Sequence, residues 1–163
     1  MFACQQEEVV PDFLCLAKGL TGGTMPLAAT LTTKEIYEGF KGEPERNFCY
    51  GHSYTGNPLG CAAALASLDV FEETGVLGDV EEKGAYLEKG LAKFSQITEI
   101  RRVGLVLGMD IEGDGKEFCE ALKEYQVLTR PILNTIVLMP PLSVTKNELD
   151  HLLGAIEKVL SKN

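Results

Sequence analysis

Lys18 is the residue whose type and setting best suit it for chemistry. It follows the apolar run Phe13–Leu16 and precedes the glycine-rich segment 19–23, so we expect it where a buried strand ends and the backbone turns sharply. A lysine amine is protonated in neutral water and becomes a nucleophile where burial disfavours its charge. Such an amine could form a Schiff base with a carbonyl compound. The simpler interpretation of Lys18 alone is a surface lysine beside a turn.

Two further loop positions carry groups that bind anions. Gly51, His52 and Ser53 offer a hydroxyl and backbone N–H groups shortly before Pro58, a residue suited to the first turn of a helix. Donors beside a helix N-terminus hold phosphate. Arg130 lies near an expected strand end, where its guanidinium could bind a carboxylate in bidentate fashion. Taken singly, His52 and Ser53 are more simply explained as ordinary loop residues, and Arg130 as a solvated surface cation.

The composition is that of a soluble globular protein. Of 163 residues, 45% are hydrophobic and 24% charged, and the net charge of −9 argues against non-specific binding to nucleic acid. No apolar stretch is long enough to span a membrane, and the first residues lack the basic and apolar regions of a secretion signal. We therefore expect a cytoplasmic protein without membrane or nucleic-acid partners.

The cysteines are not arranged for metal binding. Their number is odd, no two form a Cys-x-x-Cys pair, and the sequence holds only two histidines, so no metal site is expected. Reduced, mostly buried thiols fit a cytosolic protein. The five residues are Cys4, Cys15, Cys49, Cys61 and Cys119.

Residues 1–66 are rich in Gly, Thr and Pro and carry few regular amphipathic patterns. The expected elements are strands over 13–16 and 27–31, a helix start capped at Thr32 with Glu35 three residues later, a polar loop over 41–50 that enters a short strand, and a helix over 58–73 that stops at Gly75.

From residue 78 onward, helices and strands alternate regularly. The pattern predicts a helix capped by Asp79, strands over 100–103 and 106–111, a helix over 116–125, a strand that starts at 127–129 and is interrupted by Pro131, a strand over 136–139, and a last helix with a Thr145–Glu148 capping box.

These segments resemble the fold-type I, class III pyridoxal-phosphate aminotransferases. The class is marked by Lys-Gly-Leu-Thr-Gly-Gly at 18–23 and by Gly-Asn-Pro-Leu at 56–59. Ala-Ala-Thr-Leu-Thr-Thr at 28–33, and Arg130-Pro131 followed by Leu-Met-Pro-Pro at 138–141, favour the branch that forms diaminopelargonate in biotin synthesis. The matching segments span nearly the whole chain in the family's order.

The resemblance implies a role for each candidate site residue. Lys18 would be the lysine that binds pyridoxal 5'-phosphate and shuttles a proton. His52 and Ser53 would touch the cofactor phosphate of the neighbouring subunit in a homodimer. Gly51 would lie against substrate, and Arg130 would bind the carboxylate of 8-amino-7-oxononanoate. S-adenosylmethionine would be the amino donor.

The implied fold class is α/β, the fold-type I pyridoxal-phosphate transferase fold. Residues 1–77 would be the end of the large cofactor domain, and 78–163 a complete α+β small domain. Members of the family are much longer than this chain, and the aspartate that pairs with the pyridine nitrogen belongs to a segment upstream of the lysine. We therefore interpret the chain as the C-terminal portion of such an enzyme and expect it to be inactive alone.

Two other functions stay open at this stage. The chain could belong to another class III ω-aminotransferase, one that uses ornithine, aminobutyrate or a similar donor. Residues 78–163 could instead form a non-catalytic interaction module that pairs with another chain.

Overall fold

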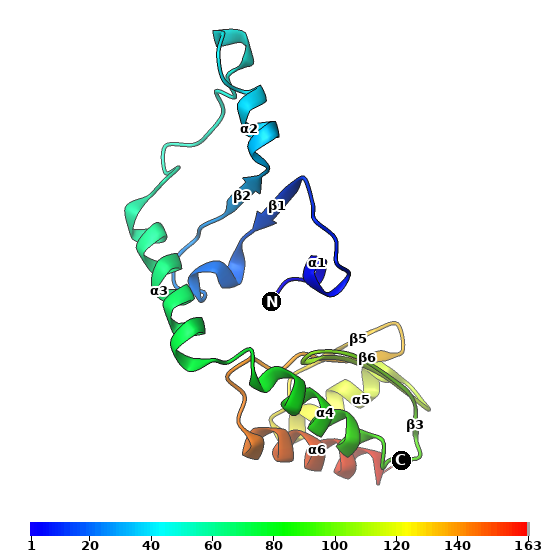
Figure 1. The fold of residues 1–163 in the computed structure, drawn as a ribbon. Coiled ribbons are helices and arrows are strands. Elements are labelled where there is room, and N and C mark those ends of the chain that lie inside the picture. The colour runs from blue at the N-terminus through cyan, green and yellow to red at the C-terminus, as the bar shows by residue number, and fades with distance from the viewer. Residues whose placement is uncertain (163) are drawn as a thin grey trace. The chain divides into compact units, whose positions relative to one another are not determined.

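The chain folds in two parts that are described separately, Met1–Thr74 and the part that begins at Gly75 (Figure 1). The structure is a computed structural model and describes residues 1–162. This division of the chain does not show what either part does. The assignment of 1–77 and 78–163 to domains of an aminotransferase therefore stays a prediction.

A two-stranded antiparallel sheet and a long helix organise the first part. In the sheet, Leu14 of β1 lies opposite Leu31 of β2. The helix α3 packs against the turn that follows β1. The elements are α1 (Ala3–Gln6), β1 (Phe13–Leu16), the 3-10 turn η1 (Lys18–Thr21), β2 (Ala29–Thr32), α2 (Lys34–Gly39), the 3-10 turn η2 (Pro44–Arg46) and α3 (Pro58–Thr74).

The structure confirms the predicted strand 13–16 and the helix that starts at Pro58 and stops before Gly75. Two predicted boundaries are wrong. β2 begins at Ala29 and not at residue 27, because the preceding turn and Pro26, which has no N–H, keep this segment out of the ladder. The helix α2 is capped by Thr33, whose hydroxyl accepts from the N–H of Ile36 at 3.4 Å.

The short strand expected at the end of segment 41–50 is also wrong. The structure has the turn η2 at Pro44–Arg46, followed by irregular backbone. A strand needs a neighbour with which to form hydrogen bonds, and no strand of residues 1–162 pairs with this segment.

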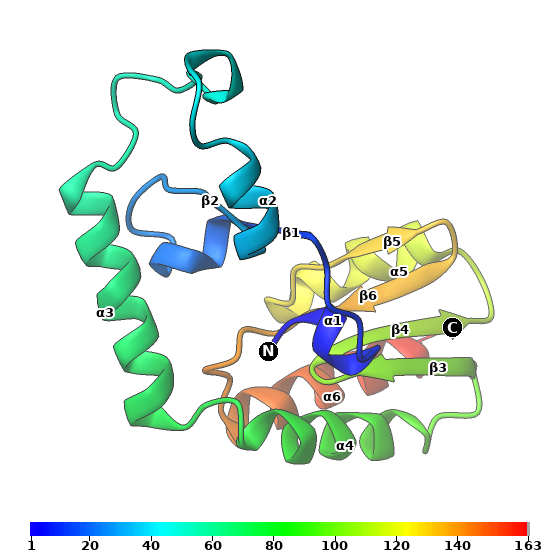
Figure 2. The same ribbon diagram turned by 45° about the horizontal axis from the view of Figure 1, so that its top comes forward.

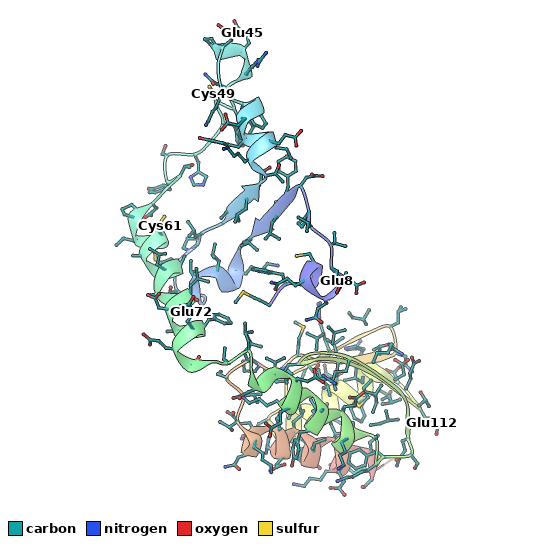
Figure 3. All side chains as sticks on the ribbon, viewed as in Figure 1. Glu8, Glu45, Cys49, Cys61, Glu72 and Glu112 are labelled. Atoms are coloured by element: carbon teal, nitrogen blue, oxygen red, sulfur yellow. The ribbon has the colours of Figure 1, made fainter. Side chains whose placement is uncertain are left out.

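Most of the thiols are not buried, contrary to expectation. All five are free, but only Cys119 is buried; Cys4 is half-buried, and Cys15, Cys49 and Cys61 are exposed. Cys61 lies on α3 and Cys49 on the loop after η2 (Figure 3). The sheet of the first part has only two strands, so it covers little of the apolar sequence around it.

The described residues include no cluster of three or more His, Cys, Asp or Glu side chains that could hold a metal ion. None of the helices in this stretch of chain has the length and apolar character needed to cross a membrane.

An antiparallel sheet in the order β3-β4-β6-β5 forms the second part. The helices α4, α5 and α6 lie together on one of its faces (Figures 1 and 2). The elements are α4 (Asp79–Leu91), β3 (Ile97–Val103), β4 (Val106–Ile111), α5 (Gly115–Leu122), the 3-10 turn η3 (Lys123–Tyr125), β5 (Arg130–Ile132), β6 (Thr135–Leu138) and α6 (Lys146–Leu160).

Alternation along the strands explains the single core of this part. Leu107, Met109 and Ile111 of β4 are buried toward the helices, as are Ile136 and Leu138 of β6, while the residues between them face the other way. The helices complete the core with apolar side chains at helical spacing, each of which contributes about 1.5–3 kcal/mol when fully buried. They are Leu87, Leu91, Phe118, Leu122, Leu149, Ile156, Val159 and Leu160.

Three terminal assignments in the second part change. Asp79 is the first residue of α4 and not its cap, since Gly78 occupies the capping position; its charge still favours the helix N-terminus. The helix α5 ends at Leu122. Residues 123–125, which were expected to continue it, form the 3-10 turn η3. Pro131 lies inside β5, because an edge strand tolerates a residue without an N–H.

The capping box at the start of α6 is confirmed. The N–H of Thr145 donates to Glu148 Oε2 at 2.7 Å, and the N–H of Glu148 donates to Thr145 Oγ1 at 3.3 Å. The N–H of Thr145, followed by its hydroxyl, which also donates to Glu148 Oε2, lowers the pKa of the Glu148 carboxyl.

Helix α4 approaches the turn between β3 and β4 very closely. A Cβ on Gly84 would lie 2.2 Å from the carbonyl oxygen of Gly104. Arg102 stabilises this contact: its Nε donates to Glu88 at 2.8 Å, and its Nη2 donates to Glu81 at 2.6 Å. The helix can therefore reach the turn only with glycine at position 84.

We predict that Gly84→Ala lowers the free energy of unfolding by about 1–3 kcal/mol, the usual range for an inserted methyl group that clashes. The matched control is Gly154→Ala in α6, where a Cβ would meet nothing within 4 Å. That control should gain about 0.5–1 kcal/mol from helix propensity. Chemical denaturation measures both, and equal stability of the two variants would contradict the close approach.

The face of the sheet that lacks helices carries a charged network. Arg101 donates to both carboxylate oxygens of Asp110 at 2.8 Å, and its Nη1 lies 2.7 Å from Glu99. The hydroxyl of Thr135 also donates to Asp110. The hydrogen bond from Arg101, followed by that from Thr135, lowers the pKa of Asp110 to about 2.

This network predicts a loss of stability in acid. The pKa of Asp110 is lower in the folded than in the unfolded chain. The contribution of Asp110 to the free energy of unfolding is therefore complete above about pH 4 and decreases as the pH drops toward 2. The stability difference between wild type and Asp110→Asn should therefore shrink over that range. The matched control is Asp69→Asn on α3, an exposed residue that forms no ion pair within residues 1–162. Denaturation midpoints at several pH values test this.

Candidate active site

Lys18 lies where β1 ends and the chain turns, as predicted. Its φ is +55°, a left-handed value that costs a non-glycine residue about 1–3 kcal/mol, and such residues gather at functional sites and tight turns. The expected burial of Lys18 is wrong, because the side chain is exposed. The reason is that β1 pairs only with β2, so the rim of this sheet stays open.

Lys18 lines a cavity of about 980 Å³ within the first part of the chain. His52 lines the same cavity, so the fold brings together two candidates that are 34 positions apart in the sequence. The other lining residues are Gly23, Thr24, Met25, Pro26, Leu27, Ala28, Tyr54, Thr55, Gly56 and Asn57. Within residues 1–162, no carboxylate lies within ion-pair distance of Lys18.

A buried threonine shapes the segment that faces Lys18. Thr21 is 2% exposed, and its hydroxyl donates to the carbonyl of Met25. The hydroxyl of Thr24 donates back to the carbonyl of Thr21 at 2.8 Å. These bonds turn the chain so that residues 23–28 line the cavity. Leu27 packs beneath α3, 3.3 Å from where a Cβ on Gly60 would lie.

The loop before α3 supplies hydrogen-bond donors. The N–H of Tyr54 donates to His52 Nδ1 at 3.1 Å, which assigns the hydrogen of the neutral ring to Nε2, where it can donate to a ligand. Asn57 Oδ1 accepts from the N–H of Leu59 at 2.9 Å and so caps α3. The Nε2–H of His52, in the loop before a helix N-terminus, suits an anionic group.

The candidate residues are not all placed in one site. Gly51 and Ser53 lie in the His52 loop but do not line the cavity, and a Cβ on Gly51 would lie 3.1 Å from Thr55 Oγ1. Arg130 belongs to the second part, which is described by itself.

Sequence reasoning missed Thr24 and Asn57, whose polar side chains line the cavity. The signal for Asn57 was available, since asparagine directly before Pro58 is typical of a helix cap.

Arg130 is the first residue of β5, opposite Val137 of β6, and it is exposed. Its register places it on the face of the sheet without helices, because Pro131 pairs with the buried Ile136. Arg101 and Arg102 both have carboxylate partners, whereas Arg130 has none among residues 1–162. Its guanidinium is therefore free to bind an anion.

Comparison with known proteins gives consistent matches over almost the whole chain. The model of the aminotransferase class-III family matches residues 1–160. The adenosylmethionine-8-amino-7-oxononanoate aminotransferase of Geobacter sulfurreducens is 40% identical over 97% of this chain. An ornithine aminotransferase of Oceanobacillus iheyensis is 37% identical over 99% of it. The chain spans only 39% and 40% of the lengths of these two relatives.

A solved structure shares the fold. The PLP-bound amine transaminase of an uncultivated Pseudomonas species is 32% identical, with a TM-score of 0.88. The match covers 99% of this chain and 41% of that one.

We predict that Thr21→Val loosens the turn that faces Lys18. The isosteric change removes the donor to Met25 and leaves a part-buried carbonyl unpaired, at a cost of about 0.5–1.5 kcal/mol, the usual net contribution of one hydrogen bond. Amide hydrogen exchange of residues 22–28 should become faster. Thr74→Val, at an exposed position near the end of α3, is the matched control: it removes a hydroxyl that donates to the carbonyl of Val70, and it should leave the exchange of residues 22–28 unchanged. Unchanged exchange in Thr21→Val would contradict this role.

Proposed function

Because the chain belongs to the aminotransferase class-III family, we propose that the whole protein is a pyridoxal-phosphate-dependent aminotransferase of biotin biosynthesis. It transfers an amino group from S-adenosylmethionine to 8-amino-7-oxononanoate and forms 7,8-diaminopelargonate. The observation that carries the proposal is the open cavity lined by Lys18, in a chain that the family model matches over residues 1–160.

The residues around this cavity fit pyridoxal 5'-phosphate. The cofactor has an aldehyde, which requires an amine, and a phosphate, which requires several donors. Lys18 supplies the amine for one cofactor, without an ionic partner among the described residues, and His52 supplies a ring N–H donor for the phosphate of a second cofactor, that of the neighbouring subunit. When bound, the cofactor supplies an electron sink for the bond to the α-carbon.

The protein's own residues then divide the work. Lys18 anchors the cofactor, and its Nζ takes up and returns the substrate proton. His52, through Nε2–H, and Ser53, through its hydroxyl, hold phosphate, and we assign them to the cofactor of the neighbouring subunit in a cytoplasmic homodimer. Gly51 lies against substrate, where the absence of a side chain leaves room. Arg130 binds the substrate carboxylate through its two parallel N–H groups.

An ω-aminotransferase that uses ornithine is the second candidate, favoured by the ornithine aminotransferase among the relatives. The two candidates share Lys18 chemistry and differ in the amino donor. With the whole protein and 8-amino-7-oxononanoate as acceptor, S-adenosylmethionine should support amino transfer and ornithine should not. The reverse preference would select the second candidate.

Borohydride reduction of the whole protein with pyridoxal 5'-phosphate tests the anchoring lysine. One pyridoxyl group should appear on the peptide that contains Lys18, because reduction fixes the Schiff base. Lys18→Ala should lose this label and reduce amino transfer by about 10²–10⁴-fold, the usual contribution of a general acid–base group. Lys41→Ala, which removes an exposed lysine paired with Glu38, should keep both. A label on another residue, or full activity of Lys18→Ala, would sink the proposal.

A further inference from the structure

We propose that Thr21 is a positioning residue for Lys18, and that its buried hydroxyl holds the strained backbone from which Lys18 lines the cavity. The proposal deepens the proposed function and rests on it for the chemistry of Lys18. The effect of Thr21 on the backbone of Lys18 is independent of cofactor and substrate.

The side chain of Lys18 is not fixed by an ionic partner. It is exposed, and no carboxylate lies within ion-pair distance of its amine in the described part of the chain. The backbone conformation at Lys18 therefore sets the direction in which the side chain leaves the chain. This direction matters for a reacting lysine, because misplacing a catalytic group by about 1 Å can cost about 100-fold in rate.

The turn around Lys18 is strained. Its φ of +55° is a left-handed value that is unfavourable for a residue with a Cβ and persists only where the surrounding structure fixes it. The sheet fixes the upstream side, because Leu16 pairs with Ala29. The N–H of Leu20 donates to the carbonyl of Ala17 at 3.2 Å and closes the turn. The downstream side needs a fixed point of its own.

Three overlapping turns connect Lys18 with the segment that lines the cavity. They cover residues 17–20, 19–22 and 21–24, and backbone hydrogen bonds of 3.2, 3.0 and 3.2 Å close them. Consecutive turns share residues, so a turn that opens at one end loosens the next. Thr21 belongs to the second and the third turn and links them.

Thr21 is the polar residue that the first part buries. Among residues 1–74 only Thr21, Gly60 and Ala64 are buried, and the last two have no polar side chain. The Thr21 hydroxyl donates to the carbonyl of Met25, and the Thr21 carbonyl accepts from the hydroxyl of Thr24 at 2.8 Å. A buried hydroxyl keeps its partner, because leaving it unpaired costs free energy. The bond to Met25 therefore fixes Thr21 relative to the lining of the cavity.

Helix α3 supports the turn from the other side. The 3-10 turn η1 packs against this helix. A Cβ on Gly22 would lie 3.7 Å from Ser67 Oγ, and a Cβ on Gly60 would lie 3.3 Å from Leu27. Small residues thus allow the turn and the helix to approach each other closely. The strained residue is therefore held between the sheet on one side and a turn packed on a helix on the other.

A packing role for the methyl group of Thr21 makes the opposite prediction to the proposed role of its hydroxyl. Thr21→Val keeps the shape and the methyl group and removes the hydroxyl. Thr21→Ser keeps the hydroxyl and removes the methyl group. The proposal requires Thr21→Val to open the turn and Thr21→Ser to preserve it, whereas a packing role requires the reverse.

Trypsin treatment of the 163-residue chain tests the backbone role without cofactor. Cleavage after Lys18 requires the strained turn to open, so its rate follows the population of the opened form. Thr21→Val should speed this cleavage by about twofold to tenfold relative to cleavage after Lys41, since one hydrogen bond is lost. Lys41 is an exposed residue that also precedes a glycine, so it serves as the internal reference.

Two further variants complete this experiment. Thr21→Ser should restore most of the protection after Lys18. Thr74→Val is the matched control, because it also removes a hydroxyl that donates to a backbone carbonyl, that of Val70 at 2.6 Å. It should leave the ratio of the two cleavage rates unchanged.

The whole protein with pyridoxal 5'-phosphate and both substrates tests the consequence for chemistry. Thr21→Val should lower kcat by about twofold to tenfold and leave the KM of either substrate unchanged, because the amine is misplaced while the groups that bind substrate stay. The pyridoxyl label trapped on Lys18 by borohydride should accumulate more slowly by a similar factor. Thr21→Ser should recover both.

An unchanged cleavage ratio in Thr21→Val, equal effects of Thr21→Val and Thr21→Ser, or a higher KM at constant kcat would each overturn the proposal. The proposed function fails separately, if the wild-type whole protein carries no label on Lys18. The cleavage ratio would then still decide whether Thr21 holds the turn, because it needs neither cofactor nor turnover.

Discussion

Consecutive residues of a strand point to opposite faces of the sheet, and in the second part only one of these faces is covered by helices. This constraint decides what each strand residue can do. Leu107 and Met109 pack in the core, while Asp110 lies on the uncovered side and pairs with Arg101. Arg130 lies on that same side, where it is exposed and has no carboxylate partner among the described residues. The strand β5 therefore holds Arg130 at a fixed position on the uncovered face of the sheet.

The first part works by a different principle, because its site is built from turns. The bond from Thr21 to Met25 folds the segment after Lys18 back on itself, and Asn57 caps α3. Both bonds replace what a sheet ladder would otherwise supply to the backbone. As a result, Lys18 and His52 line one cavity.

The proposed chemistry gives each part of the chain a different role, and each role suits the structure of that part. A covalent anchor and phosphate donors need loops, since loops can aim backbone N–H groups at a ligand. A residue that binds a carboxylate is held more rigidly on a strand, because the pairing of β5 with β6 fixes the backbone of Arg130 opposite Val137.

The sequence alone determined the long periodic elements and the residue types able to do chemistry. Local hydrogen bonding and backbone preference depend on the residue types of a short segment, so they can be predicted from the sequence. They account for the helix from Pro58, the capping box of Thr145 and the turn at Lys18. Only the tertiary structure decided what depends on neighbours. Burial needs a covering layer, so Lys18 and most thiols are exposed despite their apolar surroundings in the chain. The shared cavity of Lys18 and His52 likewise depends on contacts between distant segments, and no local pattern encodes those contacts.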